Sequence, residues 1–276
     1  MTDQKIWFIT WVSTWFGRCL LDEVLRKGDI VIGTLRKQEQ IDEFRNLYPK
    51  DAYFYLLDVR DEKWVQEIST EVINKFWKID ILVNNAWYGL TWAIEEASMP
   101  EIRDQMETNF FGAIQVTKAF LPMFRQQKFG SIIQISSMAG VVSAPWLGVY
   151  NASKYALEWF SEALSIELKP FGVDVMIVEP WPFRTKWASV WLKVAENQIN
   201  DYDETAGRLK AMKWNEMQPW DPLKGAQLII KAIEIENPPL RLALGEMAVS
   251  GIQRKIDMLQ GDLDHWKELS IDTYYS

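Results

Sequence analysis

Short runs rich in β-branched and other apolar residues alternate with longer amphipathic segments along most of the sequence. The apolar runs predict strands at residues 5–10, 29–34, 52–57, 79–83, 131–135, 173–178 and 241–244. The amphipathic segments predict helices at residues 16–27, 38–47, 62–76, 99–125, 149–168 and 221–235. Because this alternation is typical of strand–helix–strand units, we expect an α/β fold with a doubly wound, seven-stranded parallel sheet and helices on both faces.

No linker rich in proline, glycine or serine interrupts the alternation, so we expect a single domain over residues 1–276. The stretch 180–220 departs from the pattern and follows the sixth expected strand. Ligands of open α/β sheets bind beyond the carboxyl ends of the strands, so this insertion is a candidate substrate lid. A surface excursion without a role is the alternative. Residues 246–276 form a C-terminal extension.

Cysteine and histidine each occur once, as Cys19 and His265. A single cysteine excludes an internal disulfide and suits a reducing compartment, and a multi-histidine metal site cannot be built, so we expect no metal. The net charge of −8 disfavours nucleic acid and anionic lipid as partners. The apolar stretches are too short to cross a bilayer. We therefore expect a cytoplasmic protein that binds neither nucleic acid nor membrane.

A few polar residues stand where the chemistry of an α/β protein is expected. Tyr150 and Lys154 lie four residues apart in an expected helix, where the ammonium would favour the ionised phenol. Ser137 follows the fifth expected strand, at the carboxyl edge of the sheet. The sequence Asn84-Asn85-Ala86 closes the fourth strand, and Asn109 lies in a helical pattern. Each has an ordinary alternative as a surface, turn or capping residue.

In this order, these residues resemble the short-chain dehydrogenase/reductase family, and in particular bacterial reductases similar to 17β-hydroxysteroid and retinol dehydrogenases. The resemblance covers residues 5–244 and includes Thr10 to Gly17, Leu57-Asp58-Val59, Asn84-Asn85-Ala86, Asn109, Ser137, Tyr150 with Lys154, and Pro180 with Thr185. It implies a Rossmann-type fold and hydride transfer between a nicotinamide cofactor and a small apolar alcohol, ketone or aldehyde. It also implies a homodimer or homotetramer.

The resemblance assigns a role to each candidate catalytic residue. Tyr150 would be the general acid or base, and Ser137 would hydrogen-bond the substrate oxygen. Lys154 would bind the nicotinamide ribose and lower the pKa of Tyr150, and Asn109 would support the water chain that replenishes the proton. The implied cofactor-binding residues are Thr10, Ser13, Thr14, Phe16, Gly17, Arg36, Asp58, Val59, Asn85, Ala86, Tyr150, Lys154, Pro180, Phe183 and Thr185.

The end of the second expected strand favours one form of the cofactor. An acidic residue there binds the ribose 2′-hydroxyl of NAD, whereas an arginine accommodates the 2′-phosphate of NADP. The strand ends in Leu35-Arg36-Lys37, with no acid. NADP(H) is therefore favoured over NAD(H), and Arg36 is the expected phosphate ligand.

Tryptophan outnumbers glycine in this chain, 15 to 14. The family's Thr-Gly-x-x-x-Gly-x-Gly cofactor turn reads Thr10-Trp-Val-Ser-Thr-Trp-Phe-Gly17, with Trp11 and Trp15 in two glycine positions. Trp87 also stands where the family has glycine. Glycine supplies a tight turn and close approach to the pyrophosphate, so two functions stay open. The chain is an NADP(H)-dependent oxidoreductase, or a cofactor-deficient protein of the same fold that acts as a binding module.

Overall fold

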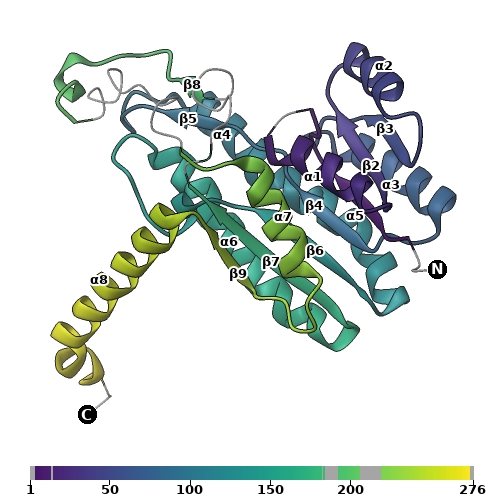
Figure 1. Ribbon diagram of the computed structural model, residues 1–276. Coiled ribbons are helices and arrows are strands. Elements are labelled where there is room, and N and C mark those ends of the chain that lie inside the picture. The colour runs from purple at the N-terminus through teal and green to yellow at the C-terminus, as the bar shows by residue number, and fades with distance from the viewer. Residues whose placement is uncertain (1–3, 14, 182, 184–191, 206–218, 274–276) are drawn as a thin grey trace.

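Seven parallel strands form the central sheet of the computed structural model, which describes residues 4–13, 15–181, 183, 192–205 and 219–273. Their order across the sheet is β3-β2-β1-β4-β6-β7-β9, and every neighbouring pair is parallel. The strands are β1 Ile6–Ile9, β2 Ile30–Leu35, β3 Ala52–Leu56, β4 Ile81–Asn84, β6 Gly130–Ile135, β7 Val173–Pro180 and β9 Arg241–Leu244. The expected fold class, Rossmann-type α/β, is confirmed (Figure 1).

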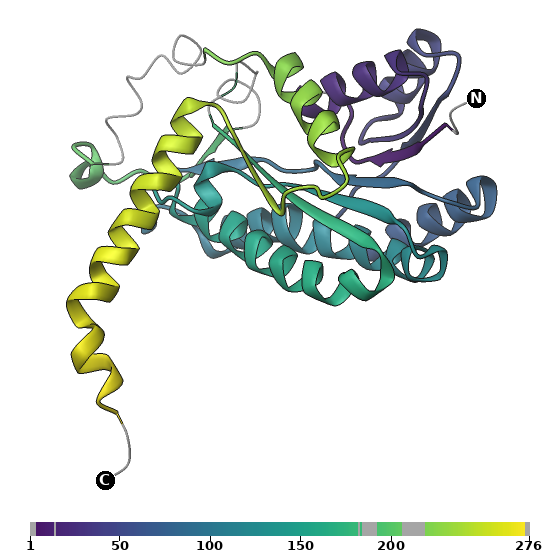
Figure 2. The same ribbon diagram turned by 60° about the horizontal axis from the view of Figure 1, so that its bottom comes forward.

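Helices cover both faces of this sheet (Figure 2). Those on one face are α1 Trp15–Arg26, α2 Gln38–Leu47 and α7 Pro222–Ile233. Those on the other are α3 Glu62–Phe76, α5 Gly112–Gln127 and α6 Gly148–Leu168, with α4 Met99–Met106 leading into α5. The last helix, α8 Glu246–Ile271, follows β9. Within the described residues, no helix has the length and hydropathy needed to cross a bilayer.

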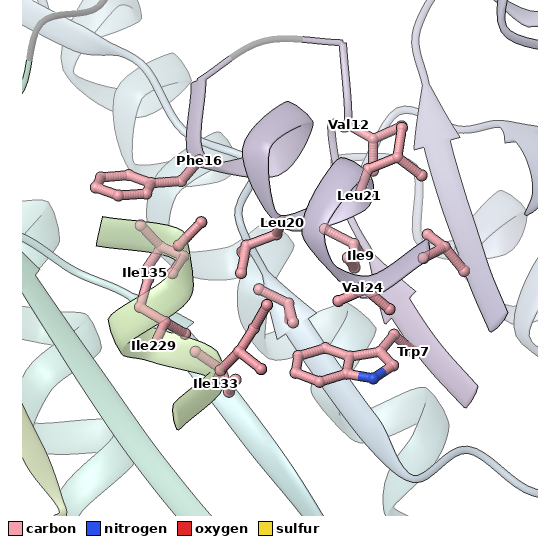
Figure 3. Packing of buried hydrophobic residues seen from close by; sticks show 14 of the residues in the cluster. Trp7, Ile9, Val12, Phe16, Leu20, Leu21, Val24, Ile133, Ile135 and Ile229 are labelled. Carbon is pink, nitrogen blue, oxygen red and sulfur yellow. The ribbon is translucent and has the colours of Figure 1, made fainter. Parts of the chain in front are cut away.

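Each face of the sheet has its own hydrophobic core, because successive side chains of a strand point to opposite faces. Along β1, Trp7 and Ile9 join the core beneath α1 and α7, whereas Ile6 and Phe8 join the core on the side of α3, α5 and α6. Figure 3 shows the first core, with Ile229 of α7 among the buried side chains. Strands buried on both faces read as continuous apolar runs, which is why their positions could be predicted within a few residues.

The expectation of one unbroken helix over residues 99–125 is wrong, because the helix is interrupted in its middle. A π-helical turn, Glu107–Phe111, separates α4 from α5. Asn109 lies in this turn, where its side chain donates to the Tyr88 carbonyl (2.9 Å) and accepts from the Tyr88 N–H (3.0 Å). The same amide donates to Ser153 Oγ at 3.0 Å. These three bonds hold the wider turn against the segment after β4 and against α6.

Two short strands were not expected. They are β5 Gly89–Thr91 and β8 Leu192–Val194, which pair in parallel as a separate two-stranded sheet. Each has three residues, too few to produce a periodic signal. This pairing joins the described part of the 180–220 insertion to the chain after β4, and its function as a lid stays a prediction.

Several tryptophans have backbone conformations that favour glycine. The φ angles of Trp11, Trp77 and Trp92 are 54°, 65° and 123°. Trp77 ends α3 as a left-handed cap whose N–H donates to the Ile73 carbonyl, and its side chain is 84% exposed. The indole of Trp77 therefore gains little from packing to offset the strain at its Cβ.

We predict opposite effects when two exposed tryptophans are replaced by glycine. Trp77→Gly relieves a left-handed residue and should raise the free energy of unfolding by about 1 kcal/mol. Trp159→Gly places glycine inside α6, where the tryptophan is 61% exposed, and should lower it by about 1 kcal/mol. Urea denaturation of both variants and the parent measures the two changes. Shifts of the same sign would contradict the strain at Trp77.

Candidate active site

Three of the expected catalytic residues meet at the carboxyl edge of β6. Tyr150 lies in the first turn of α6, Lys154 lies one turn later, and Ser137 follows the strand. The Ser137 hydroxyl lies near enough to the Tyr150 hydroxyl to influence its acidity. Lys154 Nζ donates to the Ile135 carbonyl at 2.7 Å. The parallel sheet and one helix thus bring together a phenol, an alcohol and an amine.

Burial controls the acidity of this group of side chains, because Tyr150 is 1% exposed and Lys154 is 0% exposed. Burial raises the pKa of Tyr150, and the neighbouring Ser137 hydroxyl opposes that rise. Burial lowers the pKa of Lys154 to about 7, opposed by the charge of Glu158 one turn further along α6. The same burial disfavours the charged forms of both side chains, and the expected lowering of the Tyr150 pKa by Lys154 stays a prediction.

The indole of Trp87 covers this group. Its ring centroid lies 4.7 Å from Lys154 Nζ and 5.8 Å from the centroid of the Tyr150 ring. Trp87 follows Asn84-Asn85-Ala86 at the end of β4, the strand next to β6. A glycine at this position would leave the amine and phenol open on this side. The sequence pattern marked Trp87 as unusual but did not predict this contact.

Side-chain hydrogen bonds fix the turn between β1 and α1 to the end of β4. Thr10 Oγ1 accepts from the N–H groups of Asn85 (2.8 Å) and Ala86 (3.0 Å). In return, Asn85 Nδ2 donates to the carbonyls of Thr10 and Trp11, both at 3.0 Å. A Cβ atom on Gly17 would collide with the Trp11 carbonyl and the Asn85 amide, so this position of the turn requires glycine.

The side chain of Trp11 lies between an apolar core and a cation. It is 5% exposed and belongs to the same cluster as Leu57 and Val59. The exposed Arg36, which follows β2, stacks its guanidinium on the indole at 3.9 Å from the ring centroid. Asp58, after β3, is near enough to interact with Arg36 and forms an ion pair with Arg60 at 2.7 Å. The structure therefore places the expected nucleotide-binding residues Arg36 and Asp58 at one edge.

The other expected cofactor ligands are less accessible. The rings of Phe16 and Phe183 pack edge to face, 5.0 Å apart, in the core beside α7, and the side chain of Val59 is buried. Only backbone groups of these three residues are left for a ligand. Ser13 is half-buried, and the Pro180 carbonyl accepts from Ser137 Oγ at 3.4 Å. Thr14 and Thr185 lie outside the described residues.

Two buried carboxyl groups behind the site were missed in the sequence. Arg241 Nε lies 3.4 Å from Glu158 and 3.6 Å from Glu179, and its Nη2 lies 2.7 Å from Glu162. Burial raises the pKa of Glu158 to about 7, and burial with the Glu158 charge raises that of Glu179 to about 8. The spacing of Glu158 from Lys154, one helical turn, was the only local signal. Glu179 comes from β7 and Arg241 comes from β9, so no local pattern in the sequence joins them to Glu158.

This cluster predicts a pH-dependent stability. Unfolded glutamates titrate near pH 4.3, whereas folded Glu179 keeps its proton to about pH 8. Between these values the folded state binds more protons than the unfolded state, so stability falls as pH rises. Glu179→Gln removes this loss. The change that it causes in the free energy of unfolding should therefore be more favourable at pH 8 than at pH 5, by about 1–3 kcal/mol.

Urea denaturation at pH 5, 6.5 and 8 measures this difference. The matched control is Glu162→Gln, because half-buried Glu162 contacts the same guanidinium from the outside of the cluster. The control should leave the slope of stability against pH unchanged. An equal slope for the parent and Glu179→Gln would contradict the proton held by Glu179.

Comparisons with known proteins identify the family. Residues 5–193 match the family described as short chain dehydrogenase. Oxidoreductase BOA17 of Botryotinia fuckeliana (strain B05.10) is 36% identical over 97% of this chain and 98% of its own length. A 3-ketodihydrosphingosine reductase of Bacteroides thetaiotaomicron (strain ATCC 29148 / DSM 2079 / JCM 5827 / CCUG 10774 / NCTC 10582 / VPI-5482 / E50) is 35% identical over 89% of both chains.

The fold gives the same result. The crystal structure of a short-chain dehydrogenase from Streptomyces avermitilis superimposes with a TM-score of 0.92 and 36% identity, covering 99% of this chain and 100% of the other. The finer resemblance to steroid and retinol dehydrogenases stays a prediction. The chain belongs to the short-chain dehydrogenase family of oxidoreductases.

Proposed function

We propose that this protein is an NADP(H)-dependent oxidoreductase that interconverts an alcohol and a ketone or aldehyde by hydride transfer. The observation that carries the proposal is the group of three side chains at the carboxyl edge of β6, where the hydroxyls of Ser137 and Tyr150 lie beside the amine of Lys154. The name of the relative from Bacteroides thetaiotaomicron denotes reduction of a keto compound. We propose a small apolar carbonyl compound as substrate.

The polar groups along the carboxyl edge suit a nicotinamide dinucleotide. Arg36 is an exposed residue directly after β2, with no acidic residue at the next two positions, and this favours a 2′-phosphate. Asp58 offers a carboxylate after β3, and Lys154 offers hydrogen-bond donors for ribose hydroxyls beside Tyr150. In the proposal, Arg36 and Asp58 hold the adenosine end and Lys154 holds the nicotinamide ribose. The bound cofactor supplies or accepts the hydride.

The chain's own residues handle the proton and the substrate oxygen. In reduction, the Tyr150 hydroxyl donates its proton to the carbonyl oxygen, and its raised pKa keeps that proton in place until the oxygen gains charge. Ser137 donates a hydrogen bond to the same oxygen and holds it next to Tyr150. Asn109 fixes the π-helical turn beside α6. We propose that it supports the water chain that replenishes the proton of Tyr150. In oxidation, Tyr150 takes the proton instead.

A second candidate function is a cofactor-deficient binding module. Two observations favour it: the indole of Trp87 covers Lys154 and Tyr150, and that of Trp11 is packed beneath Arg36. For catalysis, the Trp87 side chain would have to turn away from Lys154 and Tyr150. In a binding module, these aromatic side chains would instead contact an apolar ligand. Binding of the cofactor distinguishes the two functions.

Tyr150→Phe tests the catalytic role. We expect a loss of about 10²–10⁴-fold in the rate of acetophenone reduction, because the general acid is removed. Tyr155→Phe is the matched control on the same helix: its hydroxyl donates to the Val141 carbonyl, and its removal should leave the rate close to that of the parent. Steady-state kinetics with NADPH measures both. An active Tyr150→Phe variant would contradict the mechanism.

Arg36→Gln tests the cofactor preference. Calorimetric titration of the parent should give tighter binding for NADPH than for NADH. The variant should lose about tenfold to hundredfold in NADPH affinity, because a charge-assisted hydrogen bond to the phosphate is removed, and should keep its NADH affinity. Lys37→Gln, the exposed neighbour, is the control. If neither cofactor binds to the folded parent, the binding module is favoured.

A further inference from the structure

Helix α8 extends away from the rest of the molecule (Figures 1 and 2). Its base is anchored: Ala248 is fully buried, and a Cβ on Gly251 would lie 2.7 Å from Met138 Sδ. Beyond residue 256, every described residue of the helix is exposed. A long helix with so few contacts to its own protomer depends on another surface to bury its apolar side chains.

The apolar residues of α8 follow a heptad pattern. A stripe runs along one side of the helix with steps of three and four residues, formed by Val249, Ile252, Ile256, Leu259, Leu263 and Trp266. Ile252 is half-buried, and the other five are 52–60% exposed. Alternating steps of three and four are the signature of a coiled coil. This α8 stripe is therefore a contact surface for another helix.

The stripe is complementary to itself when a second copy runs in the opposite direction. In that register Val249 faces Trp266 of the second copy, Ile252 faces Leu263, and Ile256 faces Leu259. A two-fold axis between residues 257 and 258 generates each layer twice, so the interface closes as a symmetric pair. The large Trp266 is matched with the small Val249, and the other two layers each pair an isoleucine with a leucine. A parallel pair would instead stack two Trp266 indoles in one layer and two Val249 side chains in another.

The charged residues beside the stripe favour the same arrangement. In the antiparallel register, Lys255 lies opposite Asp262 of the second copy, and Glu246 lies opposite Lys267. Symmetry repeats both pairs, and no like charges meet at these flanking positions, where charges set partner choice and orientation. In a parallel pair, Asp262 would lie opposite Lys267, but Lys255 would face the uncharged Gln260, so only one of the two kinds of charge pair would form. The sequence beside the stripe thus matches an antiparallel copy of itself.

A membrane surface is a poorer partner for this helix. Its acidic residues outnumber its lysines and arginines, whereas interfacial helices carry basic residues around an apolar face. Anionic lipid would repel it. We propose that α8 is a self-association surface, through which two copies of this chain form an antiparallel two-stranded coiled coil along the α8 stripe.

The oligomeric state of the full chain tests this interface. In sedimentation analysis, Leu259→Glu should halve the molar mass of the parent, because it places a carboxylate in the central layers. Met258→Glu is the matched control: Met258 is 50% exposed on the same helix but lies off the stripe, so the mass should not change. Equal masses for Leu259→Glu and the parent, or an equal fall in the control, would overturn the proposal.

Charge reversal tests the pairing itself. Lys255→Glu and Asp262→Lys should each lower the mass, and the double variant should restore it, because the exchanged charges again face each other. Failure of the double variant to associate would contradict the register. A membrane is tested with vesicles of phosphatidylcholine and phosphatidylglycerol. If the parent co-sediments with them, and Leu259→Glu loses this binding without a change in its molar mass, the stripe is assigned to a membrane instead.

Disulfide trapping tests the direction of the helices, in a Cys19→Ser background that removes the single native cysteine. Mixed samples of Ile252→Cys and Leu263→Cys should form a disulfide between the two different variants on oxidation. Leu263→Cys alone should not, since in the antiparallel register two copies of residue 263 lie far apart. A disulfide that forms in Leu263→Cys alone would show a parallel pair and overturn the antiparallel register.

Discussion

The hydrogen bond from Lys154 Nζ to the Ile135 carbonyl joins helix α6 to the carboxyl end of β6. Tyr150 lies one turn before Lys154 on the same helix and Ser137 follows the same strand end, so this bond holds the helix and the strand that carry all three side chains together. The bond exists because parallel strands present their final carbonyls along one edge of the sheet. An amine buried there loses hydration, which is why its pKa falls to about 7.

Tryptophan in place of glycine changes the space around this edge more than it changes the fold. A left-handed tryptophan costs about 1–3 kcal/mol, which is a substantial part of the 5–15 kcal/mol that stabilises a typical domain. Two cores, one on each face of the sheet, offset that strain. Trp77 leaves its indole in water, whereas Trp11 is buried under Arg36 and Trp87 lies on Lys154. Trp11 and Trp87 therefore both add bulk at the site, and Trp11, with a φ of 54°, also adds strain.

The sequence predicted those features that depend on neighbouring residues in the chain. Buried parallel strands are local apolar runs, so all seven central strands were predicted, and the order of motifs led to Ser137, Tyr150 and Lys154. The π-helical turn was missed because it depends on Asn109 reaching the Tyr88 backbone, a contact between separate segments. The contact of Trp87 with Lys154 and the ion pairs of Arg241 are tertiary in the same way. No periodicity reports such contacts.

The base of α8 connects the proposed interface to the site. Gly251 packs on Met138, the residue after Ser137, so the first turns of α8 press on the turn that holds the serine hydroxyl. Arg241, at the start of the strand that leads into α8, is paired with Glu158, one turn after Lys154. One contact of α8 and one contact of the strand before it therefore reach the two ends of the Ser137–Lys154 group. A second copy that immobilises α8 would restrict the same turn, because close-packed contacts transmit displacement rather than absorb it.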